Sequence, residues 1–369
     1  MALLKDIRVL ELASVLAGPS VGQFFAELGA EVIKVENLQT GGDVTRTWKA
    51  AGEPSGDLSA YFCSCNWGKK SVAVDLATNA GKNLVADLAS TSDIVIASYK
   101  PGDAQKLGVS YEQLVARNDK LIYGQISGYG SENDRVGYDA VIQAESGFMD
   151  LNGEKDGPPM KMPVALIDIL AAHHLKEAIL LAMIQLYKTG KGSLVEVSLI
   201  QAAVASLANQ ASNWLVHGKL PARQGSSHPN IAPYGDAFET KDGKKILLAV
   251  GSDRQFNDLI AILGLDGNIG RFSTNQSRVV NREALNELLA TKIQARTSAD
   301  LLEKIHRAKI PGGVIQNVQQ AFIMPEVQAM LTKGGGITGV RTFAAASASW
   351  KPNTLSPPPH FGEHNAEFI

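Results

Sequence analysis

The sequence is poor in cysteine: Cys63 and Cys65 are the only two among 369 residues. They lie one residue apart, which is too few for a disulfide framework and too close for an unstrained bridge. With no second cysteine pair and no histidine nearby, the pattern is typical of small buried side chains rather than of a metal or redox site. The cysteine content therefore predicts a reducing, cytoplasmic environment.

The sequence also lacks an excess of charge of either sign. Lys and Arg total 35 against 37 Asp and Glu, which gives a net charge of −2. Such a chain has no overall field to hold a nucleic-acid backbone or an anionic membrane surface. No apolar run reaches the ~18 residues typical of a membrane span, and residues 1–7 do not resemble a signal peptide. We therefore expect no nucleic-acid partner, no membrane partner and no export, and any anionic ligand must be held by local groups.

What the sequence does have is an ordinary globular composition, with 45% hydrophobic and 20% charged residues. In the first half, β-rich runs alternate with segments of helical spacing. This alternation predicts an α/β fold with a parallel, doubly wound sheet. The expected strands are residues 8–12, 31–36, 71–76, 93–98 and 121–126, and the expected helices are 21–28, 81–89 and 111–117.

Ligands of such sheets bind beyond the carboxyl ends of the strands. We therefore expect four segments to lie around one crevice: residues 12–19, the stretch after Asn37, residues 99–102 and residues 127–138. The first half of the chain is thus interpreted as a binding face.

The second half predicts a change of architecture. A long helix is expected over residues 166–188, followed by a strand at 194–198 and another helix to about 215. Residues 221–233 are rich in Gly, Ser, Pro and Asn, as in a connector or binding loop. Beyond them a smaller α+β pattern begins with a strand at 245–250 and helices near Phe256, Leu285 and Leu301. We place a large domain, which contains the parallel sheet, at 1–210 and 326–369, and connectors with a small α+β domain at 211–325.

Two glycine-rich strings are interpreted as turns. Residues 334–339 satisfy GxGxxG, but they follow a helical run at 326–333 rather than a strand, so we predict a helix-ending turn. Residues 189–193 lack the first glycine of a phosphate loop. His173 and His174 are neighbours on a helix and point about 100° apart, so they cannot share a metal ion. No metal and no redox cofactor are expected.

Asp168 is a carboxylate among apolar neighbours, shortly after Pro163. If a helix begins after Pro163, Asp168 lies in or just beyond its first turn, where the helix dipole and free amides favour an ionised carboxylate. The residues alone allow two interpretations. Asp168 is either a structural aspartate at a helix start or a reactive carboxylate that acts as a covalent nucleophile.

An ordered set of segments over nearly the whole chain resembles the class III coenzyme A transferases. This family contains formyl-CoA and carnitine CoA-transferases and also the α-methylacyl-CoA racemases. The segments that carry the resemblance are Arg8-Val-Leu-Glu-Leu12, Ala17-Gly-Pro19, residues 28–36, Tyr99-Lys-Pro-Gly102, Gly137-Tyr-Asp139, residues 156–159, Asp168, residues 189–192, residues 311–314 and Gly362-Glu-His364.

The resemblance implies a fold, an activity and partners. It implies a large Rossmann-like domain made from both chain ends, a small domain between them, and an interlocked homodimer. It also implies an acyl-CoA:carboxylate CoA-transferase, with an acyl-CoA donor and a carboxylate acceptor as substrates, and no metal. Asp168 matches the catalytic aspartate, which would form aspartyl-anhydride and aspartyl-CoA thioester intermediates.

The resemblance and the local charge together indicate which residues bind coenzyme A. Lys69, Lys70, Lys100 and Lys106 are the cations available for its phosphates. Gly225, Ser226 and Ser227 stand where the family has a glycine-rich substrate loop. The expected CoA-binding residues are Leu16, Ala17, Asn66, Gly68, Lys70, Tyr99, Lys100, Lys106, Gly137, Tyr138 and Asp139.

Two departures from the family pattern bear on the reaction. Formyl-CoA transferase has Gln where this chain has Leu16, so specificity for oxalate and formate is not expected. The racemases have a catalytic histidine where this chain has Tyr138, whose unperturbed pKa of about 10 makes it a poor base. Transfer is therefore favoured over an α-methylacyl-CoA racemase-like epimerisation. A nucleotide-binding oxidoreductase or binding module, suggested only by the βαβ pattern and the glycine string, stays open as a further alternative.

Overall fold

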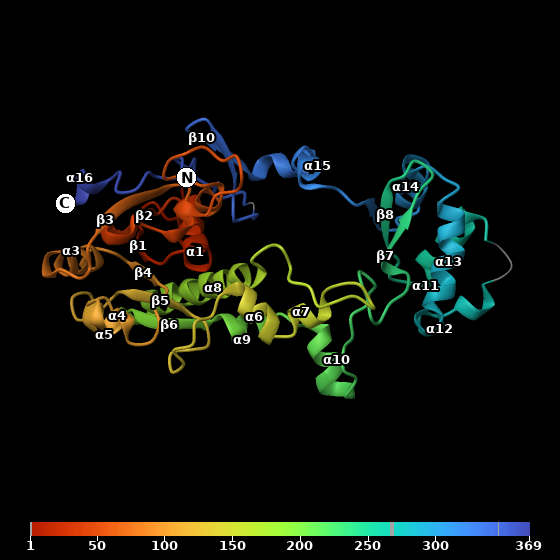
Figure 1. The fold of residues 1–369 in the computed structure, drawn as a ribbon, viewed down its shortest axis with the longest axis horizontal. Helices are drawn as coiled ribbons and strands as arrows, with labels where there is room; N and C mark the ends of the chain where they lie inside the picture. Colours follow the sequence, from red (N-terminus) through yellow and green to blue (C-terminus); the bar gives the residue numbers. More distant parts are fainter. Residues whose placement is uncertain (1, 266–268, 346) are drawn as a thin grey trace. The chain divides into compact units, whose positions relative to one another are not determined.

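The structure is a computed structural model that describes residues 2–265, 269–345 and 347–369. The chain forms two compact units (Figure 1). Unit 1 comprises residues 1–148, 161–219 and 329–369, and unit 2 comprises residues 149–160 and 220–328.

These boundaries differ from the expected ones at three places, the shortest of which is residues 326–328, which belong to unit 2. Residues 149–160 belong to unit 2, because Gly225 N donates to Gly153 O and Lys155 forms an ion pair with Glu283. Residues 211–219 belong to unit 1, because the helix α10 (Asn209–His217) follows directly after α9 (Leu199–Ala205).

Unit 1 is built on a six-stranded parallel sheet with the order β3-β2-β1-β4-β5-β6. This order is typical of doubly wound sheets, with the crossover between β1 and β4 at the middle. The prediction of an α/β fold with a parallel sheet is confirmed. The strands are β1 (Arg8–Leu12), β2 (Glu31–Asn37), β3 (Lys69–Val74), β4 (Ile94–Ala97), β5 (Ile122–Ser127) and β6 (Ser193–Ser198).

One predicted strand is displaced by two residues. The β3 strand begins at Lys69 and ends at Val74, whereas residues 71–76 were expected. Lys69 pairs with Val32 in the sheet, which starts the strand earlier. Asp75 accepts the backbone N–H of Ala77, and this local turn ends it.

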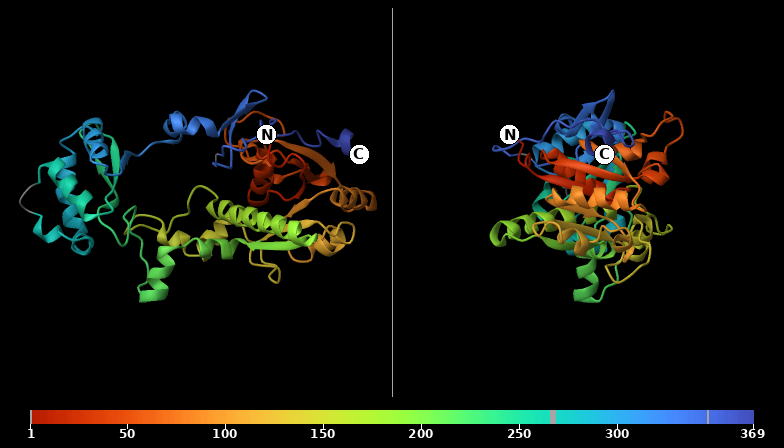
Figure 2. Two further views of the ribbon diagram at one scale, coloured as in Figure 1. Left: turned by 180° about the vertical axis from the view of Figure 1, so that it is seen from behind. Right: turned by 90° about the vertical axis from the view of Figure 1, so that its left-hand side faces the viewer.

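Successive residues of the strands pack on opposite faces of the sheet, as the strand pleat requires. Val9, Ile94 and Ile96 join the core formed with α1 (Ala17–Glu27) and α8 (Leu166–Thr189). Leu10 and Val95 join the core formed with α3 (Asn79–Ser90) and α5 (Tyr111–Val115). Helices therefore cover both faces, and α1 lies beside α8 (Figures 1 and 2).

The C-terminal tail packs on unit 1 and includes a hairpin that the sequence did not predict. Strand β10 (Leu331–Gly334) pairs antiparallel with β11 (Ile337–Val340). The expected helical run at 326–333 is wrong beyond the 3-10 helix at Pro325–Met330. Gly335 and Gly336 have φ values of 59° and 76°, so they form the hairpin turn. The GxGxxG string thus connects two strands rather than ending a helix.

Unit 2 has its own core around a small antiparallel sheet. Strand β8 (Lys245–Ala249) pairs with β7 (Tyr234–Glu239) on one side and with β9 (Gly312–Val314) on the other. The helices expected near Phe256, Leu285 and Leu301 are present and bury those three side chains. They are α11 (Asp253–Leu263), α13 (Arg282–Ile293) and α14 (Ser298–Arg307). Strand β7 was not predicted, because its register shifts between Tyr234 and Ala237 and disturbs the alternation.

The remaining elements are short. They are the helices α2 (Ala60–Cys63), α4 (Asp103–Lys106), α6 (Asp139–Glu145), α7 (Phe148–Leu151), α12 (Asn275–Val280), α15 (Val318–Phe322) and α16 (Asn365–Phe368), and the 3-10 helices Leu38–Thr40, Val44–Thr47 and Gly270–Phe272. None of the helices in the described part of the chain combines the length and the apolar character that crossing a membrane requires.

Candidate active site

Asp168 is the third residue of α8, as the sequence predicted, and is 7% exposed. The residue before the helix, Ala165, has no side chain that could cap it. Asp139, at the start of α6, takes over this role: its Oδ1 accepts the N–H of Ile167 at 2.8 Å. Its Oδ2 accepts a hydrogen bond from Gln143 Nε2 at 2.7 Å. Two helix starts are thereby joined at the residue that precedes Asp168.

The environment of Asp168 opposes its ionisation. Burial, and secondarily the negative charge of Asp139, raise the pKa of Asp168 to about 7. The sequence argument that the helix start favours an ionised carboxylate is therefore wrong in sign. A helix dipole is worth at most a few kcal/mol, and desolvation outweighs it here. Within the described residues, no hydrogen bond or ion pair to the Asp168 carboxylate offsets this cost.

Asp168 lies in the wall between two pockets of unit 1. We call the first the sheet-end pocket, a cavity of about 200 Å³ at the carboxyl ends of β1, β4 and β5. The second, the α8 pocket, is about 770 Å³ and borders the first turns of α8. Val15, Tyr138 and Asp168 line both. A group attached to Asp168 can therefore be approached from two sides.

The crevice expected from the strand ends corresponds to the sheet-end pocket and a neighbouring cavity of about 430 Å³ at the ends of β1 and β2. Ser14, Ser98 and Tyr99 line both cavities. The four segments predicted to surround one crevice thus do so together.

The loop that separates the pockets is held by a buried carboxylate. Val15 has a φ of 72°, a conformation that β-branched residues rarely adopt. Its N–H donates to Asp43 at 3.2 Å, and Asp43 forms an ion pair with Lys34 at 2.9 Å. The strained residue in the pocket wall is therefore tied to a salt bridge in the interior, which sequence reasoning did not find.

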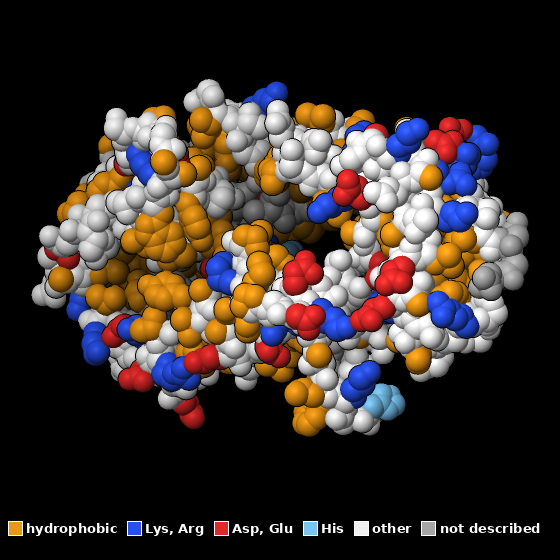
Figure 3. All heavy atoms as spheres, turned by 45° about the vertical axis from the view of Figure 1, so that its right-hand side comes forward, with side chains coloured by type: hydrophobic (Ala, Val, Ile, Leu, Met, Phe, Trp, Pro, Cys, Tyr) orange, Lys and Arg blue, Asp and Glu red, His pale blue; other side chains and the backbone are white. Residues whose placement is uncertain are grey.

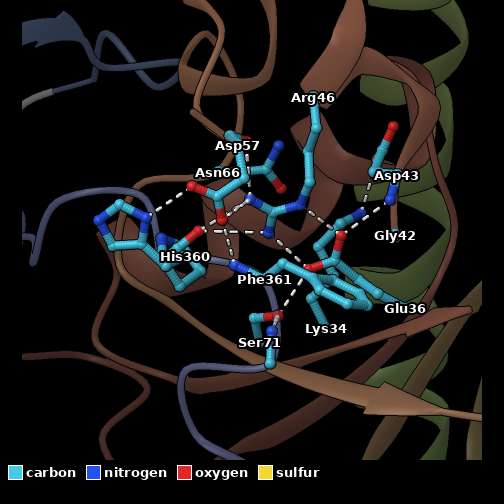
Figure 4. A network of polar contacts seen from close by, with 12 residues as sticks. Lys34, Glu36, Gly42, Asp43, Arg46, Asp57, Asn66, Ser71, His360 and Phe361 are labelled. Carbon is cyan, nitrogen blue, oxygen red and sulfur yellow. Dashed lines mark hydrogen bonds and ion pairs between the residues drawn. The ribbon is translucent and has the colours of Figure 1, made fainter. Parts of the chain in front are cut away.

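Charges buried beside this loop form a larger network (Figure 4). Lys34 and Lys69 both contact Glu11, at 3.0 and 2.7 Å, and all three side chains are fully buried. Arg46 forms an ion pair with Glu36 at 2.6 Å and donates to Pro359 O in the C-terminal tail. These contacts are structural, because the charged groups satisfy one another.

Seven of the expected CoA-binding residues line the pockets of unit 1. Of these, Tyr99 is mostly buried, whereas Tyr138 is 56% exposed. Lys100 is exposed and forms no ion pair within the described residues. The residues are Ala17, Tyr99, Lys100, Gly137 and Tyr138 in the sheet-end pocket, and Leu16, Tyr138 and Asp139 in the α8 pocket.

The other expected residues lie elsewhere. Asn66 is fully buried and accepts a hydrogen bond from Lys69, so neither is free for a phosphate. Lys70 forms ion pairs with Glu31 and Glu367 on the edge of β3. Gly68 and Lys106 line none of these pockets; Gly68 packs closely against Leu355, and Lys106 forms an ion pair with Asp103.

The expected substrate loop belongs to unit 2. Gly225 has a φ of 62°, and Ser227 Oγ donates to Asp236 Oδ1 at 2.7 Å. Ser226 precedes it in the same turn. The role of Gly225, Ser226 and Ser227 toward a substrate stays a prediction.

Sequence reasoning missed several side chains of the α8 pocket. Trp48 and Tyr61 form an edge-to-face aromatic pair with ring centroids 5.2 Å apart. Lys176 lies two turns after Asp168 on the same helix, and Arg341 comes from the end of β11. The spacing of Asp168 and Lys176 was visible in the sequence, but the fold of the tail that brings Arg341 was not.

Cys65 is buried and Cys63 half-buried, in keeping with small packed side chains. Across residues 2–265, 269–345 and 347–369, no group of three or more His, Cys, Asp and Glu side chains is arranged to hold a metal ion.

Comparison with known proteins identifies the family of this chain. The model of CoA-transferase family III matches residues 4–365. Succinate–glutarate CoA-transferase of Agrobacterium fabrum is 40% identical over 99% of this chain and 94% of its own length. Succinyl-CoA:glutarate CoA-transferase of Homo sapiens is 35% identical over 99% of this chain and 85% of its own.

A solved structure shows the same fold. The crystal structure of a CAIB/BAIF family protein from Brucella suis is 40% identical, covers 98% of this chain and 97% of its own, and superposes with a TM-score of 0.85. The family that the sequence resembled is thus confirmed. The chain belongs to CoA-transferase family III, a family of enzymes.

Proposed function

We propose that this enzyme moves CoA from an acyl-CoA to the carboxylate of a second acid, and that both acids are short dicarboxylates. The observation that carries the proposal is Asp168, a buried carboxylate without a hydrogen-bonding partner in the described structure, in the wall shared by two pockets. The dicarboxylates are suggested by relatives named for succinate, glutarate and mesaconate.

Asp168 acts as the covalent nucleophile in this proposal. Its carboxylate attacks the thioester carbonyl, forming an aspartyl-acyl anhydride and releasing CoA thiolate. The thiolate attacks the aspartyl carbonyl, which forms an aspartyl-CoA thioester and releases the donor acid. The acceptor carboxylate attacks this thioester, which gives a second anhydride and releases CoA thiolate again. The thiolate then attacks the carbonyl of the acceptor acyl group in this anhydride and displaces the Asp168 carboxylate. The products are the new acyl-CoA and free Asp168.

The burial of Asp168 suits this chemistry. A carboxylate that is poorly solvated in the ground state loses little solvation when it attacks, and water that would hydrolyse an anhydride is kept away. A pKa near 7 leaves a substantial ionised fraction at neutral pH. The two pockets give the thiolate and the acid separate routes to Asp168.

For CoA we propose the sheet-end pocket and the cavity beside it. Lys100 lines this pocket and forms no ion pair among the described residues, so it is free to meet a phosphate. Arg135 lines the same cavity but already forms an ion pair with Glu145. Tyr99 lies where the two cavities meet. Lys69, Lys70 and Lys106 are not assigned to CoA, because they line neither cavity and each is bound to other side chains.

We further propose that unit 1 is the CoA-binding domain of a cytoplasmic homodimer. Hydrophobic side chains gather on the face of unit 1 seen in Figure 3. On α8, Leu181, Ile184 and Tyr187 are exposed by 67, 53 and 91%. Exposed apolar side chains on successive turns of one helix favour a protein partner. Size-exclusion chromatography with light scattering tests the dimer, and a monomer at micromolar concentration would overturn it.

The covalent step is tested by trapping. The wild-type enzyme incubated with succinyl-CoA and then digested should yield a peptide in which Asp168 carries CoA. Asp168→Ala should yield none and lose at least ~10³-fold in transfer rate, as for other covalent nucleophiles. Glu177→Ala removes an exposed carboxylate from the same helix and serves as the control. Full transfer activity in Asp168→Ala would contradict the proposal, and deuterium incorporation at the α-carbon without an acceptor would indicate epimerisation instead.

A further inference from the structure

The α8 pocket contains a buried lysine with no partner of its own. Lys176 is 6% exposed, and within the described residues its Nζ makes no hydrogen bond or ion pair. The ring of Phe24 lies beside it, with its centroid 5.4 Å from Nζ. Buried charges are ordinarily paired, so an unpaired ammonium at the wall of a pocket points to a missing anion.

The carboxylate whose negative charge acts on Lys176 is that of Glu27. Glu27 already accepts hydrogen bonds from other donors. Glu27 is fully buried and accepts hydrogen bonds from Gln23, from Thr342 and from the N–H of Phe343. Burial lowers the pKa of Lys176 to about 8, and the charge of Glu27 acts in the opposite direction. Lys176 is therefore mostly charged at neutral pH, while the carboxylate oxygens of Glu27 are hydrogen-bonded to other groups.

The pocket as a whole suits an anion with an apolar middle. Three cationic side chains line it, Lys161, Lys176 and Arg341, against the two carboxylates Asp139 and Asp168. Asp139 is occupied by the backbone of Ile167. The Nη1 of Arg341 is buried without a hydrogen-bond partner among the described residues. Apart from these groups, most of the lining is apolar, as a methylene chain requires.

The distance between the nucleophile and the lysine sets the length of the ligand. Asp168, Ala172 and Lys176 lie on successive turns of α8 and all line the pocket. Eight residues of helix span about 12 Å, and both side chains lean toward the helix start. Because a lysine side chain is longer than an aspartate side chain, this tilt brings the two charged groups closer together than their backbone positions. The remaining gap suits a chain of about four or five carbons with a carboxylate at each end.

We propose that Lys176 binds the distal carboxylate of a dicarboxylic acid whose other carboxyl group reacts at Asp168. This inference rests on the proposed function and adds to it the residue that selects dicarboxylates. The ammonium supplies the charge-assisted hydrogen bond that a monocarboxylic acid cannot use. Ala172, between the two groups, leaves room for the methylene chain.

The test compares acceptors of equal length that differ in the charge of the distal end. Transfer from succinyl-CoA is measured with glutarate, with its half-amide glutaramate and with valerate, for the wild type, Lys176→Met and Lys188→Met. In a ping-pong reaction, kcat/KM for the acceptor does not depend on the donor. We expect Lys176→Met to lower kcat/KM for glutarate by roughly 10- to 100-fold, mainly through KM. The values for the two other acceptors should change less than about threefold.

The matched controls keep the result decisive. Lys188→Met removes an exposed lysine from the last turn of α8 and should leave the preference for glutarate unchanged. If Lys176→Met does not fold, as its melting curve would show, the wild type alone decides: it should prefer glutarate to glutaramate by at least about tenfold. An equal loss on all acceptors in Lys176→Met, or a wild type that uses glutarate and glutaramate equally, would overturn the role of Lys176.

The proposed function fails in a different way. If no acid accepts CoA and no adduct forms on Asp168, the transferase mechanism itself is wrong. If transfer to valerate, glutaramate and glutarate is equally efficient and the Asp168 adduct forms, the transfer mechanism stands, and the distal-carboxylate site is lost together with the preference for dicarboxylates.

Discussion

Asp139 Oδ1 accepts the backbone N–H of Ile167 at 2.8 Å, one residue before Asp168. The same carboxylate therefore positions the start of α8 and adds a negative charge beside the proposed nucleophile. Both effects act on the reaction: the hydrogen bond holds the backbone of Asp168 in place, and the charge helps to raise its pKa. A single side chain thus links geometry and proton affinity at this site.

The first prediction separates these two effects. In Asp139→Asn the side chain keeps an acceptor for Ile167 but loses its charge, so the pKa of Asp168 should fall. Because Asp168 attacks as the ionised form, transfer activity rises with pH through this pKa, and the acidic limb of the profile should move to lower pH. Asp139→Asn also loses the hydrogen bond that Oδ2 accepts from Gln143, which should cost about 1 kcal/mol of stability.

The measurement is the pH dependence of kcat/KM between pH 5 and 9, with Glu177→Gln as a control at an exposed position of α8. The limb of the control should coincide with that of the wild type, near pH 7. If the acidic limb of the pH profile is the same in Asp139→Asn as in the wild type, the charge of Asp139 does not affect the pKa of Asp168.

The second prediction concerns stability. The folded-state pKa of Asp168, about 7, lies above 3.8, the ordinary value for an aspartate side chain. A carboxyl group whose pKa is higher in the folded than in the unfolded state stabilises the fold most at pH below 3.8. This contribution is lost as pH rises through 7. Asp168→Asn avoids the buried charge, so it should stabilise the fold at pH 8 by on the order of a few kcal/mol.

Urea denaturation at several pH values measures this effect. The free energy of unfolding of Asp168→Asn minus that of the wild type should increase between pH 4 and 7 and stay constant above. A difference that does not vary with pH would mean that the carboxylate is well solvated in the folded protein.

How far the sequence predicts the fold depends on whether the relevant contacts are local. The strand and helix patterns of unit 1 are local, so β1, β2 and α8 were found close to their observed bounds. The hairpin β10–β11 was missed, because residues 326–333 have helical spacing in the sequence. Only pairing with β11 makes Leu331–Gly334 a strand.

The site shows the same division. Asp168 was identified from its apolar neighbours and the family pattern, but the sign of its pKa shift was not. That shift depends on the burial of the carboxylate and on Asp139, which is 29 residues away in the chain. Likewise Lys69 and Asn66 look available in the sequence, and only the fold reveals that Lys69 is bound by both Glu11 and Asn66. Tertiary burial decides which charged groups face a ligand.

The third prediction concerns Asp43, which holds the loop between the pockets. Asp43→Ala removes the acceptor of the Val15 N–H and leaves Lys34 without one of its two carboxylates. Breaking a buried ion pair of this kind should cost about 3–5 kcal/mol. Asp43→Asn retains an acceptor for Val15 and should cost less.

Denaturation curves of the two variants, with kcat/KM at a permissive temperature, check this prediction. Because Val15 lines both pockets, Asp43→Ala should also lose transfer activity at temperatures where it remains folded. Full activity in folded Asp43→Ala would show that the conformation of Val15 does not depend on Asp43.

The fourth prediction concerns the attachment of the C-terminal tail (Figure 4). The guanidinium of Arg46 forms an ion pair with Glu36 and donates to Pro359 O, and it stacks 3.8 Å from the ring centroid of Phe62. Arg46→Met should therefore cost about 3–5 kcal/mol, because Glu36 is left buried without its partner. The amides of residues 360–364 should exchange hydrogen faster, because the tail loses its anchor.

The exposed end of the same network gives the matched control. His360 is an exposed residue that contacts Asp57 at 2.7 Å, and His360→Ala should change stability by less than about 1 kcal/mol. Hydrogen exchange of the tail in this variant should stay close to the wild type, since Phe361 N still donates to Asp57. If Arg46→Met and His360→Ala accelerated exchange in the tail equally, the anchor would be the surface contact with Asp57 rather than the buried arginine.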